Sequence, residues 1–318
     1  MLIFALDREE RGFAEALARD LDVQLAPHEE RRFEDGERKV RPLVDPRGDD
    51  AYVLHSLHGD PADSPEDKLV RLLMFVATLR EHGARRVTAV VPYLAYARKD
   101  RQTKPYDPVS LRHVAQMFES VGTAQIIVLE VHNPAAFQNA FRIPTVHLES
   151  SRAFDTVLAT VAGAGRLALA SPDPGGTKRA QLWREDLEAR LQQPVGFAMV
   201  DKRRSAGLVG GTRLVAGDVN GSTVLLFDDL IATGTTLQRA AHALRLAGAE
   251  RVIACAAHGL FVGGAREMLE DEALDRILVT DSVPGFRLPA AARARVQVVS
   301  AVGLFAEAIR ESHASWTR

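Results

Sequence analysis

One stretch of the sequence constrains the fold more than any other: residues 224–237, which read VLLFDDLIATGTTL. Four apolar residues, Val224–Phe227, predict a buried strand of the parallel type, and two acids, Asp228 and Asp229, follow directly. A turn rich in threonine and glycine comes next, and residues 237–244 have the apolar spacing of a helix. In an open α/β sheet, ligands bind beyond the carboxyl ends of the strands. The stretch therefore predicts two carboxylates at a sheet edge, beside a helix start whose N–H groups suit a phosphate.

Acids next to an anion-binding turn suit a polyol that is bound through its hydroxyls and its phosphate, with a divalent cation nearby. The competing interpretation is that Asp228 and Asp229 only cap the helix, and that Gly234 only serves the turn. A cap requires one acid directly before the helix, whereas these two stand several residues upstream, at the predicted strand tip. We therefore favour a binding site.

Strand and helix patterns alternate along the whole chain. Strands are predicted at residues 2–6, 51–54, 87–91, 126–129, 167–170, 196–200, 223–227, 252–256 and 276–279. Helices are predicted at residues 11–21, 66–82, 110–120, 152–161, 178–191 and 302–309. This alternation predicts an α/β fold with parallel sheets. Two similar series predict two domains: residues 1–147, with the C-terminal helix at about 298–318 packing on the first domain, and residues 148–297.

Composition excludes several classes of protein. The net charge of −2 gives no reason to expect nucleic acid as a partner. The single cysteine, Cys255, lies in an apolar run and reads as a core residue, so no disulfide can form within the chain. No apolar run is long enough to span a membrane, and no basic start with an apolar core suggests export. We therefore expect a cytoplasmic protein.

Four further segments are candidates for function. Residues 92–101 form a cation-rich loop after a predicted strand, and residues 28–38 place Phe33 among charges. Residues 171–177 form a glycine-containing loop after another strand. The basic residues 201–204 precede a polar stretch, 205–212, that suggests a mobile flap. The glycine-rich phosphate loop that ends in G-K-[ST] does not occur.

Five of these segments, in order, resemble the ribose-phosphate diphosphokinase family, also called phosphoribosyl pyrophosphate synthetases, over essentially the full length. Residues 32–37 and 96–101 resemble its two ATP-binding segments. Residues 171–176 resemble its pyrophosphate loop, 201–204 the start of its catalytic flexible loop, and 224–236 its ribose-5-phosphate motif. Details at residues 91–96 and 258–263 are more similar to the archaeal-type branch than to the bacterial one.

The resemblance implies two tandem phosphoribosyltransferase-like (type I) domains, each with a mainly parallel sheet flanked by helices. It implies transfer of the β,γ-diphosphoryl group of ATP to the C1 hydroxyl of ribose 5-phosphate, with Mg²⁺ as cofactor, giving phosphoribosyl pyrophosphate and AMP. It also implies a homo-oligomer, at least a dimer, because Phe33 would stack on the adenine from a neighbouring subunit.

The site residues that the resemblance implies fall into five groups. The catalytic loop cations are Lys202 and Arg204. The ATP-binding residues are Phe33, Asp35, Glu37, Arg98, Asp100 and His132. The ribose-5-phosphate-binding residues are Asp228, Asp229, Thr233, Gly234, Thr235 and Thr236. The pyrophosphate loop contributes Asp173, Gly175 and Gly176, and the metal-contacting positions are His132 and Asp173.

One position departs from the family pattern. Residue 232 is alanine, where the bacterial-type enzymes usually have aspartate and archaeal-type ones often serine. An alanine side chain can neither accept a proton nor bind a hydroxyl, so Asp228, Asp229 or a metal ion would have to activate the C1 hydroxyl. Two alternatives stay open: a non-catalytic regulatory paralogue of a synthetase, and a phosphoribosyltransferase, which shares the ribose-phosphate motif.

Overall fold

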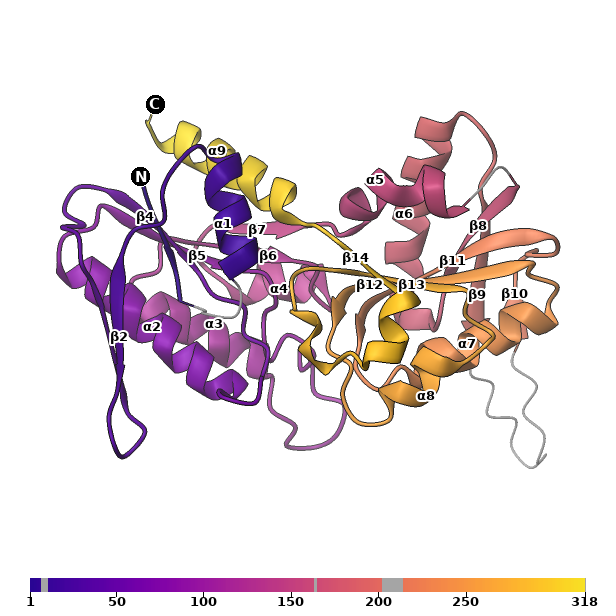
Figure 1. Ribbon diagram of the computed structural model, residues 1–318, viewed down its shortest axis with the longest axis horizontal. Coiled ribbons are helices and arrows are strands. Elements are labelled where there is room, and N and C mark those ends of the chain that lie inside the picture. The colour runs from indigo at the N-terminus through magenta and orange to yellow at the C-terminus, as the bar shows by residue number, and fades with distance from the viewer. Residues whose placement is uncertain (7–10, 163–164, 202–213, 318) are drawn as a thin grey trace. The chain divides into compact units, whose positions relative to one another are not determined.

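The computed structural model describes residues 1–6, 11–162, 165–201 and 214–317 (Figure 1). The chain divides into two compact units. Unit 1 comprises Met1–Glu149, Ser282–Pro284 and Ala301–Arg318. Unit 2 comprises Ser150–Asp281 and Gly285–Ser300.

The core of unit 1 is a parallel five-stranded sheet. Its strand order is β1 (Leu2–Ala5), β4 (Asp50–Leu54), β5 (Arg86–Val91), β6 (Gln125–Leu129) and β7 (Thr145–Leu148). Every residue of β4 and β6 is buried. Continuous burial is expected where helices cover both faces of a parallel sheet.

Helices cover the two faces of this sheet in pairs. The helices are α1 (Arg11–Asp20), α2 (Pro65–Glu81), α3 (Ser110–Ser120), α4 (Pro134–Ala140) and α9 (Val302–Thr317). Figure 1 shows α2 and α3 on one side and α1 and α9 on the other. The rings of Phe13 and Phe305 join α1 to α9, with centroids 5.6 Å apart. The C-terminal helix therefore belongs to unit 1.

A charged hairpin stands apart from the sheet of unit 1. Strands β2 (His28–Arg32) and β3 (Arg38–Pro42) pair antiparallel and form a two-stranded sheet of their own. The hairpin extends away from the sheet in Figure 1, with residues 33–37 as its turn.

Unit 2 is built on a seven-stranded sheet. Its order is β10 (Leu214–Ala216), β9 (Gly196–Asp201), β8 (Arg166–Ser171), β11 (Ser222–Ile231), β12 (Arg251–Gly259), β13 (Arg276–Thr280) and β14 (Val296–Val299). All neighbours are parallel except β10 and β9. The helices are α5 (Ser151–Ala162), α6 (Thr177–Leu191), α7 (Thr235–Leu246) and α8 (Ala265–Glu270), with short 3-10 helices at Pro174–Gly176, Gly285–Arg287 and Ala290–Ala294.

Aromatic packing joins two of these helices to β11. The rings of Phe154 on α5 and Trp183 on α6 both contact Phe227, with centroids 6.2 Å and 4.7 Å from its ring. Leu237 and Leu244 of α7 belong to a separate buried cluster with Val224 of β11. Strand β11 is therefore packed on both faces.

The two units repeat one topology. In each unit a strand and a helix, β1–α1 and β8–α6, are followed by two antiparallel strands and then by alternating strands and helices; in unit 2, α5 precedes this series. In each sheet, the first strand lies beside the strand that follows the antiparallel pair: β1 beside β4, and β8 beside β11. The predicted α/β class with two related domains is thus confirmed, and β4 is the counterpart of β11.

Strand β11 is longer than the predicted 223–227, and Asp228 and Asp229 lie inside it. The strand continues because Asp228, Leu230 and Ile231 pair with β12 as far as Gly259. Helix α9 is also longer, ending at Thr317 instead of residue 309. Both predicted elements end at the last residue of an apolar run, although buried residues such as Asp229, Ile231 and Ser312 lie beyond it.

Candidate active site

The carboxyl end of β11 projects beyond one of its two neighbours. Its pairing with β8 stops at Leu226 opposite Ala170, whereas its pairing with β12 continues to Ile231 opposite Gly259. The last residues of β11 therefore border the loop that follows β8, which is the segment predicted to bind pyrophosphate. Two candidate segments that are distant in sequence meet at one sheet edge.

Arg179 contacts both acids of β11. Its Nη1 lies 3.3 Å from Asp229 Oδ1 and 3.8 Å from Asp228 Oδ1. The backbone N–H of Asp229 also donates to Asp228 Oδ1 at 2.9 Å. Asp229 is buried, and Asp228 and Arg179 are half-buried. The guanidinium thus offsets much of the repulsion between two adjacent carboxylates.

The two acids differ in electrostatics. Burial, together with the neighbouring charge of Asp229, raises the pKa of Asp228 well above its ordinary value. A carboxyl group with a raised pKa holds a proton more readily and can also accept one near neutral pH. The site therefore places an acid–base group beside a second acid that is paired with a cation.

The pyrophosphate loop has a fixed backbone. Asp173 Oδ1 accepts hydrogen bonds from the N–H groups of Gly175 at 2.9 Å and Gly176 at 3.2 Å. Ser171 Oγ donates to the carbonyl of Asp173 at 2.6 Å. A Cβ atom added to Gly176 would lie 2.8 Å from Ser171 Oγ, so a larger residue does not fit there.

The turn after β11 requires glycine for two reasons. Gly234 has a φ of +74°, which lies in the left-handed region. An added Cβ would lie 2.7 Å from atoms of Met268, a buried residue of α8. Thr233 and Thr235 are exposed on either side, and their hydroxyl oxygens lie 3.1 Å apart.

Helix α7 presents its N-terminus without a side-chain cap. Within the part of the chain that the structure describes, Gly234 makes no capping hydrogen bond. Its counterpart α2 in unit 1 has a full capping box, in which Ser64 and Asp67 satisfy each other's backbone N–H groups. Because the first N–H groups of a helix attract anions, only the unit 2 turn is open to a phosphate.

In unit 1, the predicted adenine-binding residues lie in the turn of the β2–β3 hairpin. The N–H of Phe33 donates to the carbonyl of Glu37 at 2.8 Å, and the N–H of Glu37 donates to Asp35 Oδ1 at 3.0 Å. Phe33 is half-buried, with the Arg31 guanidinium 4.9 Å from its ring centroid. Asp35 and Glu37 are exposed.

The second predicted ATP segment lies at the carboxyl end of β5. The segment is joined to the end of the neighbouring strand β6, because Asn133 Nδ2 donates to Asp100 Oδ2 at 2.7 Å. Asn133 also caps α4 by accepting from the N–H of Ala136 at 3.1 Å. Arg98 and His132 are both exposed on these segments. Three of the predicted residues thus come from one edge of the unit 1 sheet.

Some predictions fall outside what the structure describes. Lys202 and Arg204, together with the flap at 205–212, lie in residues 202–213, outside the described part of the chain. Of the two metal-contacting positions, His132 belongs to unit 1 and Asp173 to unit 2. Among the described residues, no group of three or more His, Cys, Asp or Glu side chains forms a metal site by itself.

Sequence reasoning missed Arg179 and Asn133. Arg179 lies in the first turn of α6, where a positive charge is unfavourable next to the helix dipole. A cation at that position was therefore a signal that a negative group lies nearby. Asn133 had the signal of an N-cap, since Pro134 follows it at the first helical position.

The fold is that of an α/β protein of phosphoribosyltransferase-like architecture, and the edge of its unit 2 sheet brings two carboxylates, Arg179 and the uncapped start of α7 together. Residues 1–122 match the model of the N-terminal domain of ribose phosphate pyrophosphokinase, and residues 211–317 match that of the phosphoribosyl synthetase-associated domain. The chain belongs to the ribose-phosphate pyrophosphokinase family.

Individual relatives match nearly the whole chain. A ribose-phosphate pyrophosphokinase of Thermotoga maritima is 33% identical over 302 residues, which cover 94% of this chain and 91% of the relative. One of Brucella melitensis is 36% identical over 283 residues, covering 89% and 87%. The crystal structure of phosphoribosylpyrophosphate synthetase from Mycobacterium smegmatis is 29% identical, with a TM-score of 0.86 and 99% of each chain covered.

A membrane-spanning helix is not found: in the described ranges, no helix is both long and apolar enough to cross a bilayer.

Proposed function

We propose that this protein transfers the β,γ-diphosphoryl group of ATP to the C1 hydroxyl of ribose 5-phosphate, giving phosphoribosyl pyrophosphate and AMP. In this reaction the C1 oxygen forms a bond to the β-phosphorus while the bond from that phosphorus to the oxygen of AMP breaks. The hydroxyl proton is lost. The observation that carries the proposal is the end of β11, where paired acids lie beside the uncapped start of α7.

Ribose 5-phosphate binds along this edge. The N–H groups of residues 233–236 and the threonine hydroxyls hold its phosphate, since an uncapped helix start offers donors and a partial positive charge. Asp228 and Asp229 accept hydrogen bonds from the ribose hydroxyls. With alanine at position 232, Asp228 is the nearest candidate to take the C1 proton, and its raised pKa suits that role.

Diphosphoryl transfer needs positive charge around the moving group. The loop at 173–176 borders this edge, with the N–H groups of Gly175 and Gly176 bonded to Asp173, and Arg179 in the first turn of the next helix supplies positive charge. Lys202 and Arg204 supply the remaining cations. Their segment would cover the reacting groups and exclude water, which suppresses hydrolysis of ATP.

ATP binds through the unit 1 segments. Arg98, Asp100 and His132 bind the nucleotide from the ends of β5 and β6. Phe33 stacks on the adenine of a neighbouring subunit, with Asp35 and Glu37 reaching its base or ribose. The charged, exposed hairpin turn supports this assignment, because it gives Phe33 little apolar surface of its own to pack against. The protein therefore acts as a homo-oligomer, at least a dimer.

Mg²⁺ is the cofactor that this chemistry requires. Mg²⁺ is commonly held by one or two carboxylates together with substrate phosphates, and keeps some of its waters. The described residues fit that mode, because they offer separate carboxylates but no complete cage. Asp173 and His132 are the proposed contacts. Bound Mg²⁺ would neutralise phosphate charge.

Two finer assignments are also proposals. The first assigns the protein to the archaeal-type branch of the family, and its support is the sequence detail at residues 91–96 and 258–263. The second is a location in the cytoplasm, which suits an enzyme that consumes ATP.

The test is AMP formation by the purified protein with ATP, Mg²⁺ and a panel of sugar phosphates. We expect AMP only with ribose 5-phosphate. No AMP with any sugar phosphate, together with activation of a separate synthetase, would support the regulatory paralogue that Ala232 keeps open. Reaction of phosphoribosyl pyrophosphate with a free base, without ATP binding, would support a phosphoribosyltransferase.

A further inference from the structure

The β2–β3 hairpin depends on side chains for its orientation. Throughout the described ranges, its strands pair with each other and share no sheet with β1, β4, β5, β6 or β7. Both strands are rich in charged residues, and few of their side chains pack on the core: His28 lies against the rings of Phe4 and Phe75, and Val40 packs against the core cluster. The turn of this hairpin carries Phe33, and polar contacts with the rest of unit 1 add directional restraint to that packing.

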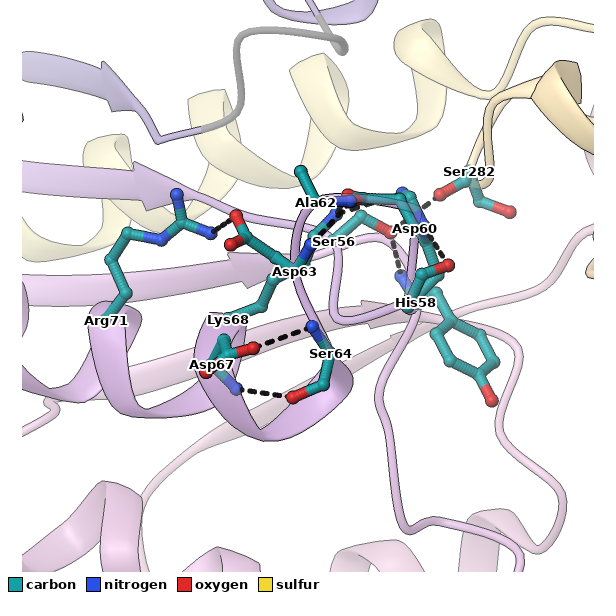
Figure 2. Close-up of polar contacts among 12 residues, drawn as sticks. Ser56, His58, Asp60, Ala62, Asp63, Ser64, Asp67, Lys68, Arg71 and Ser282 are labelled. Carbon is teal, nitrogen blue, oxygen red and sulfur yellow. Dashed lines mark hydrogen bonds and ion pairs between the residues drawn. The ribbon is translucent and has the colours of Figure 1, made fainter. Parts of the chain in front are cut away.

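Arg71 of α2 supplies such a contact to β2. Its side chain is only 4% exposed. Nη1 donates to Glu30 Oε2 at 3.1 Å, and Nη2 donates to Asp63 Oδ2 at 2.6 Å. Figure 2 shows Arg71 reaching from its helix to Asp63. One buried guanidinium thus links the hairpin to the loop that precedes α2.

Asp63 extends the same link to β3. Its second oxygen, Oδ1, accepts a hydrogen bond from Arg38, the first residue of that strand. Both strands of the hairpin are therefore tied, through Arg71 and Asp63, to the first turns of α2. Charge-assisted contacts of this kind are stronger and more directional than neutral hydrogen bonds.

The turn that presents Asp63 is itself fixed. Asp60 Oδ1 accepts from the N–H groups of Ala62 and Asp63, both at 2.8 Å. Its Oδ2 lies 2.8 Å from Nζ of Lys68, and the two side chains are only 6% and 1% exposed. Figure 2 shows these residues gathered at the start of α2. The loop cannot shift without breaking a buried ion pair.

The same helix end also contacts the second ATP segment. The hydroxyl of Tyr96 donates to Glu66, a residue of the first turn of α2. The N–H of Tyr93 donates to Ser56 Oγ at 3.2 Å, and the N–H of Leu57 donates to the Tyr93 carbonyl at 2.9 Å. The start of α2 therefore contacts Tyr96 of the second ATP segment, and through Arg71 and Asp63 it contacts the two strands that flank the first.

We propose that Arg71 is a positioning residue for ATP: it fixes the β2–β3 hairpin to the start of α2, so that Phe33 is held where it can stack on adenine. This inference rests on the proposed function, and it assigns Arg71 no contact with substrate. It predicts that loss of Arg71 weakens nucleotide binding while leaving the ribose-5-phosphate site of unit 2 intact.

The test compares Arg71→Met with Arg41→Met in the full-length protein. Arg41 lies on the same hairpin and pairs with Glu29, but both side chains are well exposed, at 52% and 37%. We expect Arg71→Met to weaken binding of a non-hydrolysable ATP analogue by about tenfold and to raise the KM for ATP similarly, which is the effect of losing one well-placed charged contact. The KM for ribose 5-phosphate and the behaviour of Arg41→Met should stay near wild type.

A second variant keeps the inference testable if Arg71→Met fails to fold. Glu30→Gln leaves Arg71 paired with Asp63 and weakens only the hairpin contact, so it should show a smaller loss of ATP affinity in the same direction. Equal ATP binding by all three variants and wild type would overturn the inference, as would parallel rises in both KM values. Failure of the wild-type protein itself to bind ATP would instead overturn the proposed function.

Discussion

Arg179 is a cation shared by two adjacent carboxylates, and its replacement tests the electrostatics of the sugar site. In Arg179→Met, Asp228 and Asp229 lose their counter-charge, and removing one partner of such a buried pair is strongly unfavourable. We expect kcat/KM for ribose 5-phosphate to fall by about 100-fold, which corresponds to nearly 3 kcal/mol. Steady-state kinetics measure this loss.

The matched control is Lys178→Met, which removes the same charge from an exposed neighbouring position. It should change kcat/KM by less than about twofold, since exposed charges contribute little. An equal effect of both substitutions would mean that kcat/KM depends on the overall positive charge of the region, and not on the contact of Arg179 with the two acids.

Replacement of Gly234 tests the turn that is proposed to hold the phosphate. Gly234→Ala places a Cβ 2.7 Å from Met268 in a backbone with a φ of +74°. Strain of this kind costs about 1–3 kcal/mol of folding free energy. We therefore expect a lower Tm and weaker binding of ribose 5-phosphate, measured by thermal denaturation and calorimetry.

Gly264→Ala is the corresponding control, because an added Cβ there meets nothing within 4 Å and the backbone φ is −76°. It should keep the wild-type Tm and affinity. A Gly234→Ala protein that binds the sugar phosphate normally would exclude this turn as the phosphate site.

At the scale of single elements, the start of β4 carries a buried carboxylate that joins three parts of unit 1. Asp50 accepts paired hydrogen bonds from Arg85 and from Arg86, and its Oδ2 lies 3.2 Å from His313 Nδ1 on α9. Burial alone would raise the pKa of Asp50, but the contacts with Arg86 and Arg85 hold it well below its ordinary value.

This lowered pKa predicts a pH-dependent contribution to folding. The unfolded carboxyl binds its proton near pH 4, above the folded pKa, so the stabilisation by Asp50 is complete at neutral pH and is lost as the pH falls below about 5. Asp50→Asn should lower the free energy of unfolding at pH 7 by about 1.5–3 kcal/mol, because the charged hydrogen bonds are lost but Arg85 and Arg86 keep access to water. Urea denaturation at several pH values would show this difference shrinking with acid; a constant difference would contradict the account.

The sequence predicted the elements whose signal is local. The apolar runs at 87–91, 126–129 and 252–256 gave the buried parallel strands, because such strands are covered on both faces. It did not predict β2 and β3. The residues His28–Arg32 do not alternate between apolar and polar, and no two-residue turn motif follows them. It also ended β11 too early, because backbone pairing continues beyond the apolar residues.

The same distinction applies to the site. Asp173, Gly234 and the two acids of β11 follow recognisable local motifs. Arg179 lies 50 residues from Asp229 along the chain, and Arg71 lies 41 residues from Glu30. Contacts of this kind are created by strand order and by the packing of helices on sheets, which single-sequence patterns do not specify.

At the scale of the whole molecule, the repeated topology gives a reason why unit 2, and not unit 1, is the proposed site for the sugar phosphate. The counterparts β4–α2 and β11–α7 differ at the helix start, which is capped by Ser64 and Asp67 in unit 1 and uncapped in unit 2. Asp60 also fills the unit 1 turn with a carboxylate that accepts two backbone N–H groups. The unit 1 turn therefore carries its own anion, and the unit 2 turn is left for a substrate phosphate.

The proposed completion of each active site by a neighbouring subunit predicts complementation. Phe33→Ala and Asp229→Asn should each be nearly inactive alone. The first variant loses the ring that stacks on adenine, and the second loses a carboxylate that binds the sugar. Mixing and reassembling the two proteins should restore activity, because some sites then combine an intact hairpin with an intact unit 2. Absence of recovery in verified mixed oligomers would show that Phe33 acts within its own subunit or not at all.

The most direct measurement of the central claim is ³¹P NMR of ATP, Mg²⁺ and ribose 5-phosphate incubated with the wild-type protein. The account predicts that the α-phosphorus becomes the monoester of AMP while a diphosphate ester appears on the sugar, with the 5-phosphate retained. Formation of ADP with a singly phosphorylated C1, or release of free diphosphate, would contradict it.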